Sequence, residues 1–323
     1  MAHYFVTGAA GFIASRICEL LLEQGHEVTG IDNVNDVYDS RLKEYRLKKL
    51  ESREGFRFFR GDITDFDSMT PMFDNQDYAA VINIAGMPGV RLSMEDPWLY
   101  LDVNAKGTLN LLEQSRRHGV MKFIQASTSS IYGANAPIPT PETACSDRPL
   151  QPYAVSKKSA EVQCYAYHYL YGIDVSVFRF FTVYGPAGRP DMAMYRFIRW
   201  ISEGETIQLN GDGNQTRGFT YVDDIARGCI LGLKNVGYEI MNLGGHESIS
   251  INDLIAKMEE KIGKKAVVQH NPIVKADMLS NLADVSKART LLGWEPQVSL
   301  DEGLQRSIDW YQSERSFLKD IRL

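Results

Sequence analysis

Cysteine is scarce in this chain, which argues against a fold held together by disulfides. The 323 residues include four cysteines, widely separated and without a C-x-x-C pair: Cys18, Cys145, Cys164 and Cys229. A secreted disulfide framework and a zinc site built from paired cysteines are both disfavoured. We expect four reduced thiols, no bound metal and a cytoplasmic location.

Long apolar runs and an excess of positive charge are also missing. No uncharged apolar run approaches the length that crosses a bilayer. The first structural pattern begins at residue 3, which leaves no room for a signal peptide. The formal net charge is −6, without a long Lys/Arg block, and this argues against a nucleic-acid-binding groove. We therefore expect no membrane and no nucleic acid among the partners.

Short apolar runs alternate with helical patterns along the first part of the chain. The expected strands are rich in valine, isoleucine and phenylalanine: residues 3–7, 27–32, 57–62, 80–85, 122–127 and 175–181. The expected helices lie between them, at residues 11–24, 40–52, 66–74, 98–118 and 153–171. This alternation predicts an α/β fold, a doubly wound parallel sheet with helices on both faces.

The alternation breaks after residue 181, which indicates a second, smaller domain. A chain of 323 residues has room for one large domain and one smaller one. We expect the first domain to contain residues 1–181 and 217–245. Residues 182–216 and 246–323 are assigned to the second.

Two glycines directly follow the first expected strand. In HYFVTGAAGFIAS, Gly8 and Gly11 stand between a strand and a helix. A residue without Cβ permits the tight turn, and a second lets the backbone approach a pyrophosphate at the helix N-terminus. Ala14 takes the third fingerprint position, where alanine still permits close packing. A βα turn without a ligand is the alternative, but the flanking strand and helix favour a dinucleotide site.

Acidic residues end the next two strands. Asp32 is placed to bind the adenosine ribose hydroxyls and disfavours a 2′-phosphate, so we expect NAD rather than NADP. Asp62 is placed to meet the adenine edge. The first domain is therefore interpreted as an NAD-binding Rossmann domain. Its expected cofactor contacts in these segments are Gly8, Gly11, Phe12, Ile13, Asp32, Asn33, Asp62 and Ile63.

Tyrosine precedes lysine by one helical turn in two places. Tyr153 precedes Lys157 in QPYAVSKKSAE, and Tyr45 precedes Lys49 in KEYRLKKL. A free tyrosine has a pKa of about 10, and a neighbouring positive charge lowers it. Residues i and i+4 share a helix face, so either lysine could serve. The segment around Tyr45 is charged on nearly every side and is typical of an exposed helix, so we expect the pair at Tyr153 to be catalytic.

A run of hydroxyl side chains ends the fifth expected strand. Ser127, Thr128, Ser129 and Ser130 lie at the carboxyl edge, where open α/β sheets bind ligands. A hydroxyl bound to a substrate alcohol can orient a proton for a tyrosine base. A polar loop of ST-turns is the alternative for such a run taken alone. Its position before Tyr153 and beside the glycine turn favours the catalytic interpretation.

Together these segments resemble the extended short-chain dehydrogenase/reductases that act on nucleotide sugars. The motifs are GAAGFIAS, STSSIYG, YAVSK, RFFTVYGP and TRGFTYVDD, and the resemblance covers nearly the whole chain. It implies a tightly held NAD, Tyr153 as the base, Lys157 as the group that tunes it and Thr128 as the hydroxyl partner. It makes the second domain a nucleotide-sugar-binding domain. Three further contacts are implied: Asn104 with the cofactor, Arg217 with the pyrophosphate of the sugar nucleotide and Asp277 with its nucleoside.

The two residues after Thr128 distinguish reactions within this family. Dehydratases carry Asp-Glu at the positions of Ser129 and Ser130, and decarboxylases that make UDP-xylose carry glutamate at the position of Ser130. This chain has neither acid. The resemblance therefore implies oxidation at C4, rotation of a transient 4-keto sugar and return of the hydride. That reaction is the NAD-dependent 4-epimerisation of a UDP-sugar.

Two loops point to the sugar. VYGPAGRPDMAMYRF and PGVRLSMEDP resemble loops of the UDP-glucuronate 4-epimerases. The resemblance implies that Arg189 binds the C6 carboxylate through its planar fork and that Thr182 assists. Arg91, Ser129 and Ser130 are the further expected substrate contacts. Arg189 could instead hold a backbone carbonyl or an acidic neighbour.

The expected reaction converts UDP-glucuronate to UDP-galacturonate, and other activities share parts of the pattern. A UDP-glucose or UDP-N-acetylglucosamine 4-epimerase shares the catalytic residues and differs in the pocket. A UDP-glucuronate decarboxylase lacks support at Ser130, and a non-catalytic NAD-binding scaffold would be expected to lose Tyr153 or Lys157. The segment NIAGMPGV departs from the family, which usually has histidine in the fourth strand and alanine-glutamine after it; Asn83, Met87 and Pro88 stand here.

Two expected helices carry apolar side chains on more than one face. They cover residues 98–118 and 153–171, and the second contains Tyr165, Tyr167, Tyr169 and Tyr171. Burial within one subunit is the simplest explanation. Relatives pair these helices across a two-fold axis, so the resemblance implies a homodimer.

Overall fold

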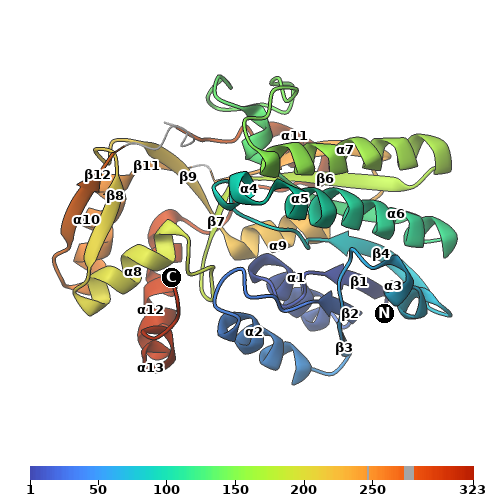
Figure 1. The fold of residues 1–323 in the computed structure, drawn as a ribbon, viewed down its shortest axis with the longest axis horizontal. Coiled ribbons are helices and arrows are strands. Elements are labelled where there is room, and N and C mark those ends of the chain that lie inside the picture. The colour runs from blue at the N-terminus through green and yellow to red at the C-terminus, as the bar shows by residue number, and fades with distance from the viewer. Residues whose placement is uncertain (246, 273–279) are drawn as a thin grey trace.

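A large sheet with helices on both faces adjoins a smaller lobe (Figure 1). The structure is a computed structural model that describes residues 1–245, 247–272 and 280–323. Asp277 lies outside the described residues, so its expected nucleoside contact stays a prediction.

Seven parallel strands form the large sheet in the order β10-β6-β5-β4-β1-β2-β3. Their bounds are β1 His3–Thr7, β2 Glu27–Asp32, β3 Phe56–Arg60, β4 Tyr78–Asn83, β5 Lys122–Thr128, β6 Asp174–Phe180 and β10 Tyr238–Leu243. The predicted doubly wound parallel sheet is confirmed. The strand order reverses between β1 and β4, and such a switch point is where open sheets bind ligands at their carboxyl edge.

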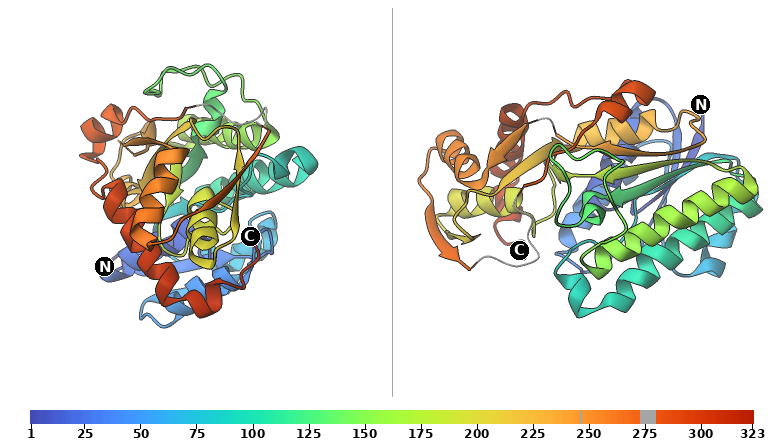
Figure 2. Two further views of the ribbon diagram at one scale, coloured as in Figure 1. Left: turned by 90° about the vertical axis from the view of Figure 1, so that its left-hand side faces the viewer. Right: turned by 90° about the horizontal axis from the view of Figure 1, so that it is seen from above.

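Helices cover both faces of this sheet (Figure 2). One face packs against α1 Phe12–Glu23, α9 Val222–Leu231 and α11 Ser286–Leu292, with α2 Arg41–Glu51 beside α1. The other packs against α3 Phe66–Phe73, α6 Gly107–Arg117 and α7 Pro152–Tyr171. Helix α7 begins with a proline in its first turn and ends at Gly172, whose φ of 72° is left-handed. Proline is preferred in the first turn of a helix and glycine just after its end. The local sequence therefore sets where α7 begins, and with it the position of Tyr153.

The helix expected over residues 98–118 contains a different local geometry. It consists of α5 Pro97–Tyr100, a π-helical segment Leu101–Lys106 and α6 Gly107–Arg117, and it follows the short helix α4 Leu92–Glu95. Asn104 lies in the π-helical segment. π turns inside helices commonly mark functional sites.

The smaller lobe has two short sheets and its own apolar core. Strands β7 Thr182–Tyr184, β9 Thr216–Tyr221 and β11 Ser248–Ser250 form one sheet, and β8 Thr206–Asn210 and β12 Val267–Asn271 form the other. The helices are α8 Ala193–Glu203, α10 Ile251–Ile262, α12 Leu300–Ser313 and α13 Arg315–Leu318. Phe197, Leu254 and Ile308 are among the buried side chains of this core.

The chain passes between the two parts at different points from those expected. We assigned residues 217–245 to the first domain, but β9 pairs with β7 and β11 in the smaller lobe, and α9 and β10 are what return to the large sheet. Residues 283–294, assigned to the second domain, contribute Ala288 and Trp294 to the core of the large sheet. The indole of Trp294 donates a 2.8 Å hydrogen bond to the Asp224 carbonyl on α9. The division into two functional domains stays a prediction.

The described residues show no helix both long enough and apolar enough to cross a membrane. The same part of the chain has no group of three or more histidine, cysteine, aspartate or glutamate side chains that could hold a metal ion. All four cysteines are free thiols, and three of them are buried.

Candidate active site

A cleft of about 1070 Å³ runs from the carboxyl edge of the large sheet into the smaller lobe. Most of the residues that the sequence singled out line it: Gly8, Gly11, Phe12, Ile13, Asp32, Asn33, Asp62, Ile63, Arg91, Thr128, Ser129, Ser130, Tyr153, Lys157, Thr182, Arg189 and Arg217. Asn104 is 1% exposed and lies behind the cleft wall. Its amide donates to the Met87 carbonyl and to the Ser156 hydroxyl and accepts from the Met87 N–H.

The glycine turn forms one end of the cleft. Gly8 has a left-handed φ of 70°, and a Cβ there would lie 2.9 Å from Cα of Ala85 on the adjacent chain segment. Gly11 N–H donates to the Gly8 carbonyl at 2.7 Å, and a Cβ on Gly11 would lie 2.8 Å from that oxygen. Both positions therefore require glycine. The N-terminus of α1 lines the cleft, and its first turn contains no acidic residue to offset the positive end of the helix, so this end suits a diphosphate.

Carboxylates shape the neighbouring wall. Asp32 accepts from the Ala10 N–H at 3.1 Å and from the Val34 N–H at 2.7 Å, so it fixes the glycine turn as well as facing the cleft. Asn33 donates to Asp62 at 2.8 Å. Burial opposes ionisation of Asp62, but hydrogen bonds from Thr64 and Asn33 outweigh it and hold its pKa below the ordinary value. These groups and the helix N-terminus fit the ribose hydroxyls and phosphates of a dinucleotide.

Lys157 lies deep in the cleft floor. It is 5% exposed, and its Nζ donates to the Ala126 carbonyl at 3.2 Å. Gly86 makes room for it, because a Cβ there would lie 2.8 Å from Nζ. Burial disfavours the charged ammonium and lowers the pKa of Lys157 to about 8.

Tyr153 differs from expectation in one respect. We expected Lys157 to lower its pKa, but the pKa of Tyr153 is raised in the chain alone because burial disfavours the phenolate. The hydrogen bond from Thr128 and the charge of Arg189 act in the opposite direction. Thr128 Oγ1 accepts from the Ser130 N–H at 3.1 Å, which leaves its own proton to point at the phenol. Tyr100 packs edge-on against the Tyr153 ring at 6.2 Å between centroids.

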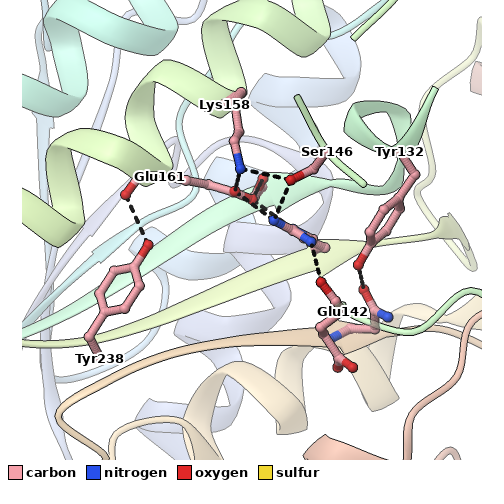
Figure 3. Close-up of polar contacts among 9 residues, drawn as sticks. Tyr132, Glu142, Ser146, Lys158, Glu161 and Tyr238 are labelled. Carbon is pink, nitrogen blue, oxygen red and sulfur yellow. Dashed lines mark hydrogen bonds and ion pairs between the residues drawn. The ribbon is translucent and has the colours of Figure 1, made fainter. Parts of the chain in front are cut away.

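The hydroxyls after β5 serve different purposes. Ser127 donates to Glu161 on α7 at 2.6 Å, and Glu161 is paired in turn with Arg179 on β6. Figure 3 shows this buried network around Glu161, in which Lys158 and Ser146 also take part. Ser127 therefore ties strand β5 to helix α7.

The network also fixes the loop between β5 and α7. Arg179 donates to the Glu142 carbonyl at 3.3 Å, and the Glu142 carboxylate accepts from the Asn242 N–H at 2.7 Å. Tyr132 donates to the Asn242 side chain at 2.6 Å (Figure 3). The Thr128 end of β5 and the Tyr153 end of α7 are thus held by one set of hydrogen bonds.

The smaller lobe contributes positive charge to the cleft. Arg189 donates through Nε and Nη2 to Asp191, at 3.1 and 2.5 Å. In the chain alone, Arg189 therefore holds an acidic neighbour, which is one of the alternatives that the sequence left open. Arg217 donates to the Thr216 carbonyl at 2.7 Å. Arg196 also lines the cleft, with a buried Nε that has no hydrogen-bond partner among the described residues, and sequence reasoning missed it.

Sequence reasoning also misjudged α2. Lys43 faces the cleft at 6% exposure and donates to Asn35 at 2.7 Å, although the charged sequence of this helix predicted an exposed one. Its buried face is visible only as the spacing of Leu42, Lys43, Arg46, Leu47 and Leu50. Tyr45 lies away from the cleft: it stacks on Phe317, donates to Glu314 and has Lys49 over its ring at 4.3 Å.

Comparison with known proteins agrees with this geometry. A protein from Thermodesulfobacterium geofontis named UDP-glucuronate 4-epimerase is 51% identical over 324 residues, which covers 100% of both chains. An uncharacterised protein from Methanocaldococcus jannaschii is 38% identical, with 97% of each chain covered.

Solved structures agree as well. UDP-glucuronic acid 4-epimerase from Bacillus cereus, in complex with UDP-glucuronic acid and NAD, matches with a TM-score of 0.91 and 39% identity, covering 96% of this chain and 99% of that one. UDP-glucose 4-epimerase from Thermotoga maritima, with UDP-glucose, matches with a TM-score of 0.88 and 31% identity, covering 97% and 99%.

The resemblance to nucleotide-sugar epimerases of the extended short-chain dehydrogenase/reductase group is thereby confirmed. The model of the NAD dependent epimerase/dehydratase family matches residues 4–244, which contain the glycine turn, the hydroxyl run and the Tyr153 helix. The chain belongs to the NAD dependent epimerase/dehydratase family.

Proposed function

We propose that this chain interconverts UDP-glucuronate and UDP-galacturonate by NAD-dependent epimerisation at C4. The observation that carries the proposal is one cleft that brings together Tyr153, Thr128, Lys157 and Arg189, with the Thr128 hydroxyl and the charge of Arg189 both acting on the Tyr153 phenol. Ser129 and Ser130 stand where the family's dehydratases and decarboxylases carry acids. The full-length likeness to a protein named UDP-glucuronate 4-epimerase supports the assignment.

The two ends of the cleft suit the two ligands. The N-terminus of α1, Asp32 and Asp62 would hold NAD, which when bound supplies the acceptor and donor of the C4 hydride. Four guanidinium groups line the cleft on the sugar-nucleotide side, against the carboxylates of Glu95 and Asp191: Arg91, Arg189, Arg196 and Arg217. This balance favours a ligand with a diphosphate and a further carboxylate.

Thr128 and Tyr153 would move the O4 proton. The Ser130 N–H fixes the oxygen of Thr128, and the Thr128 hydroxyl acts on the Tyr153 phenol, so a sugar hydroxyl beside Thr128 would have a short path for its proton. Bringing more positive charge to the phenol lowers its pKa from the raised value of the chain alone. The 4-keto sugar would turn about its pyrophosphate and present its other face, so that C4 takes the hydride back with inverted configuration while O4 regains its proton from Tyr153 through Thr128.

The C6 carboxylate needs its own restraint. An acid with a ketone at the β-position loses CO₂ when the breaking bond aligns with the carbonyl π system. Arg189, with the hydroxyls of Thr182, Ser129 and Ser130, would hold the carboxylate out of that alignment. Asn281 donates to Ser129 at 3.4 Å and helps to orient it.

Incubation of the purified protein with UDP-glucuronate, without added NAD, tests the proposal when the products are identified by NMR. UDP-galacturonate is expected, and UDP-xylose or unchanged substrate would contradict it.

A UDP-glucose 4-epimerase is the second candidate, because Asp191 already occupies the fork of Arg189 and the Thermotoga maritima enzyme is structurally similar. Equal or faster conversion of UDP-glucose would favour that candidate.

We also propose a homodimer and a cytoplasmic location. The surface of α5, the π-helical segment, α6 and α7 exposes large apolar side chains: Trp98, Leu99, Leu101, Leu109, Val155, Val162, Tyr165, Tyr169, Leu170 and Tyr171. Trp98 is 74% and Tyr169 77% exposed, so burial within one subunit does not account for them. A second copy packed on this two-helix surface would cover them. The cytoplasmic location is supported by the four free thiols, which are typical of a reducing compartment.

A further inference from the structure

Arg46 connects the two ends of the cleft without lining it. It lies on α2 at 3% exposure. Its Nη1 donates to the Ala10 carbonyl in the glycine turn at 3.0 Å and to the Tyr38 hydroxyl at 2.9 Å. Its Nε and Nη2 both donate to the Ala187 carbonyl, at 2.9 and 2.7 Å. One guanidinium thus joins the turn after β1 to the loop before α8.

The chemistry of these contacts is unusual for a buried cation. Among the described residues, Arg46 has two carbonyls and a phenol as hydrogen-bond acceptors, and no carboxylate. Burying a charge without an opposite charge is costly, so a side chain that only filled space at this position would be better apolar. A guanidinium is the side chain whose donors reach several acceptors in a fixed plane. Its use here indicates a geometric role.

The backbone that Arg46 holds is itself constrained. Ala187 has a φ of 56°, a left-handed value that is unfavourable for a residue with a Cβ. Such values persist where the surroundings impose them, and they gather at functional sites. Arg189 follows two residues later, and the Met192 N–H donates back to its carbonyl at 3.3 Å. The position of the Ala187 carbonyl therefore helps to set where Arg189 enters the cleft.

We propose that Arg46 is a positioning residue for acidic sugars: it fixes residues 185–192 to the glycine turn and so aims Arg189 at the C6 carboxylate. The inference rests on the proposed function. Because Arg46 acts through the loop, its loss should weaken recognition of the carboxylate much more than recognition of the UDP portion. Lysine at position 46 keeps the charge, but its single nitrogen cannot span Ala10 and Ala187 with paired donors.

The test is a set of calorimetric affinities for UDP-glucuronate, UDP-glucose and UDP. In the wild type, tighter binding of UDP-glucuronate than of UDP-glucose supports the proposed function, and its absence counts against that function alone. Arg46→Lys should reduce the affinity for UDP-glucuronate by about tenfold and change the other two by less than threefold. In an Arg189→Ala background the same change should add less than twofold. A uniform loss for all three ligands, or a full tenfold loss without Arg189, would overturn the inference.

Ala187→Gly is the second variant, because glycine accepts the left-handed φ and keeps the carbonyl. It should retain the wild-type ratio of affinities, since the fork of Arg46 still holds the loop. If Ala187→Gly lost the preference for UDP-glucuronate over UDP-glucose, local backbone strain rather than Arg46 would be what places Arg189. This variant keeps the inference open to refutation should Arg46→Lys fail to fold.

Discussion

Ser127 Oγ lies 2.6 Å from Oε1 of Glu161 and donates a hydrogen bond to it. Ser127 directly precedes Thr128 on β5, and Glu161 is one helical turn beyond Lys157 on α7. The carboxylate is 1% exposed and is also bound by Arg179 (Figure 3). This contact therefore links the two elements that bring Thr128 and Tyr153 together.

Ser127→Ala should lower kcat by about three- to tenfold with little change in KM. The Glu161–Arg179 pair and the bond from Lys157 to the Ala126 carbonyl remain in this variant, but the hydrogen bond from Ser127 on β5 to Glu161 on α7 is lost. A hydrogen bond to a charged group is worth about 1.5–3 kcal/mol. Ser115→Ala is the matched control, since Ser115 is also fully buried and donates at 2.8 Å to the Leu111 carbonyl, far from the cleft. The midpoint temperature of thermal unfolding should fall in both variants. A kcat equally reduced in both would mean that stability alone is responsible.

The buried ammonium of Lys157 predicts a pH dependence of stability. Its pKa is lowered to about 8, whereas an unfolded chain titrates near the ordinary value, so between these values the unfolded state binds more protons. The contribution of Lys157 to the free energy of unfolding should therefore rise with pH across this window, by roughly 2 kcal/mol between pH 8 and 10. The buried thiols of Cys18, Cys164 and Cys229, whose pKa values burial raises, act in the opposite direction, so the contribution is obtained by comparison with a variant. Urea unfolding of protein freed of dinucleotide measures it.

Lys157→Met provides the control for this slope. The variant should be more stable than the wild type at pH 7 to 8, and its advantage should shrink by roughly 2 kcal/mol between pH 8 and 10. An identical pH dependence in both proteins would show that Lys157 is not the titrating group.

Arg189→Ala should reduce kcat/KM for UDP-glucuronate by about 10- to 100-fold and leave that for UDP-glucose within about threefold, because a charge-assisted hydrogen bond to the carboxylate contributes about 1.5–3 kcal/mol. Steady-state kinetics on both sugars measures the difference. Similar losses on both would reject Arg189 as the carboxylate ligand.

Asp191→Asn should act in the opposite direction. Asp191 occupies Nε and Nη2 of Arg189 in the chain alone, and the amide is a weaker competitor for the fork. The affinity for UDP-glucuronate should increase several-fold in this variant, with that for UDP-glucose unchanged. Reduced affinity for the acidic sugar would indicate that Asp191 orients Arg189 for binding rather than competing with the ligand.

The exposed surface of α7 predicts the oligomeric state. Light scattering should give twice the 36.4 kDa mass of one chain. Val162→Arg should yield the monomer, because Val162 is 58% exposed within the apolar surface. Val267→Arg is the matched control, since Val267 is 63% exposed on β12 in the smaller lobe. A monomeric wild type, or a dimer that survives Val162→Arg, would contradict this arrangement.

Local patterns were sufficient to predict much of the large sheet. Strands β1 and β2 have the bounds expected from HYFVT and EVTGID, and Gly8 and Gly11 form the expected turn. These features depend on strand alternation and on backbone geometry at glycine, which are readable over a few residues.

What sequence reasoning missed depends on tertiary contacts. The pairing of β9 with β7 joins distant segments, and the π-helical geometry around Asn104 has no short sequence signal. The burial of Lys43 and Arg46 accompanies their contacts with the loops at Asn35, Ala10 and Ala187, which the charged composition of that helix does not reveal. The raised pKa of Tyr153 likewise reflects burial, whereas the sequence spacing between Tyr153 and Lys157 takes account of only one neighbouring charge.

Epimerisation through direct oxidation at C4 is tested most directly with UDP-glucuronate deuterated at C4. Incubated with the protein in ordinary water, it should give UDP-galacturonate that keeps deuterium at C4, at a rate slowed by a primary isotope effect, while Tyr153→Phe should give almost none. Loss of the label to solvent, or a product with the label retained but CO₂ released, would contradict the account.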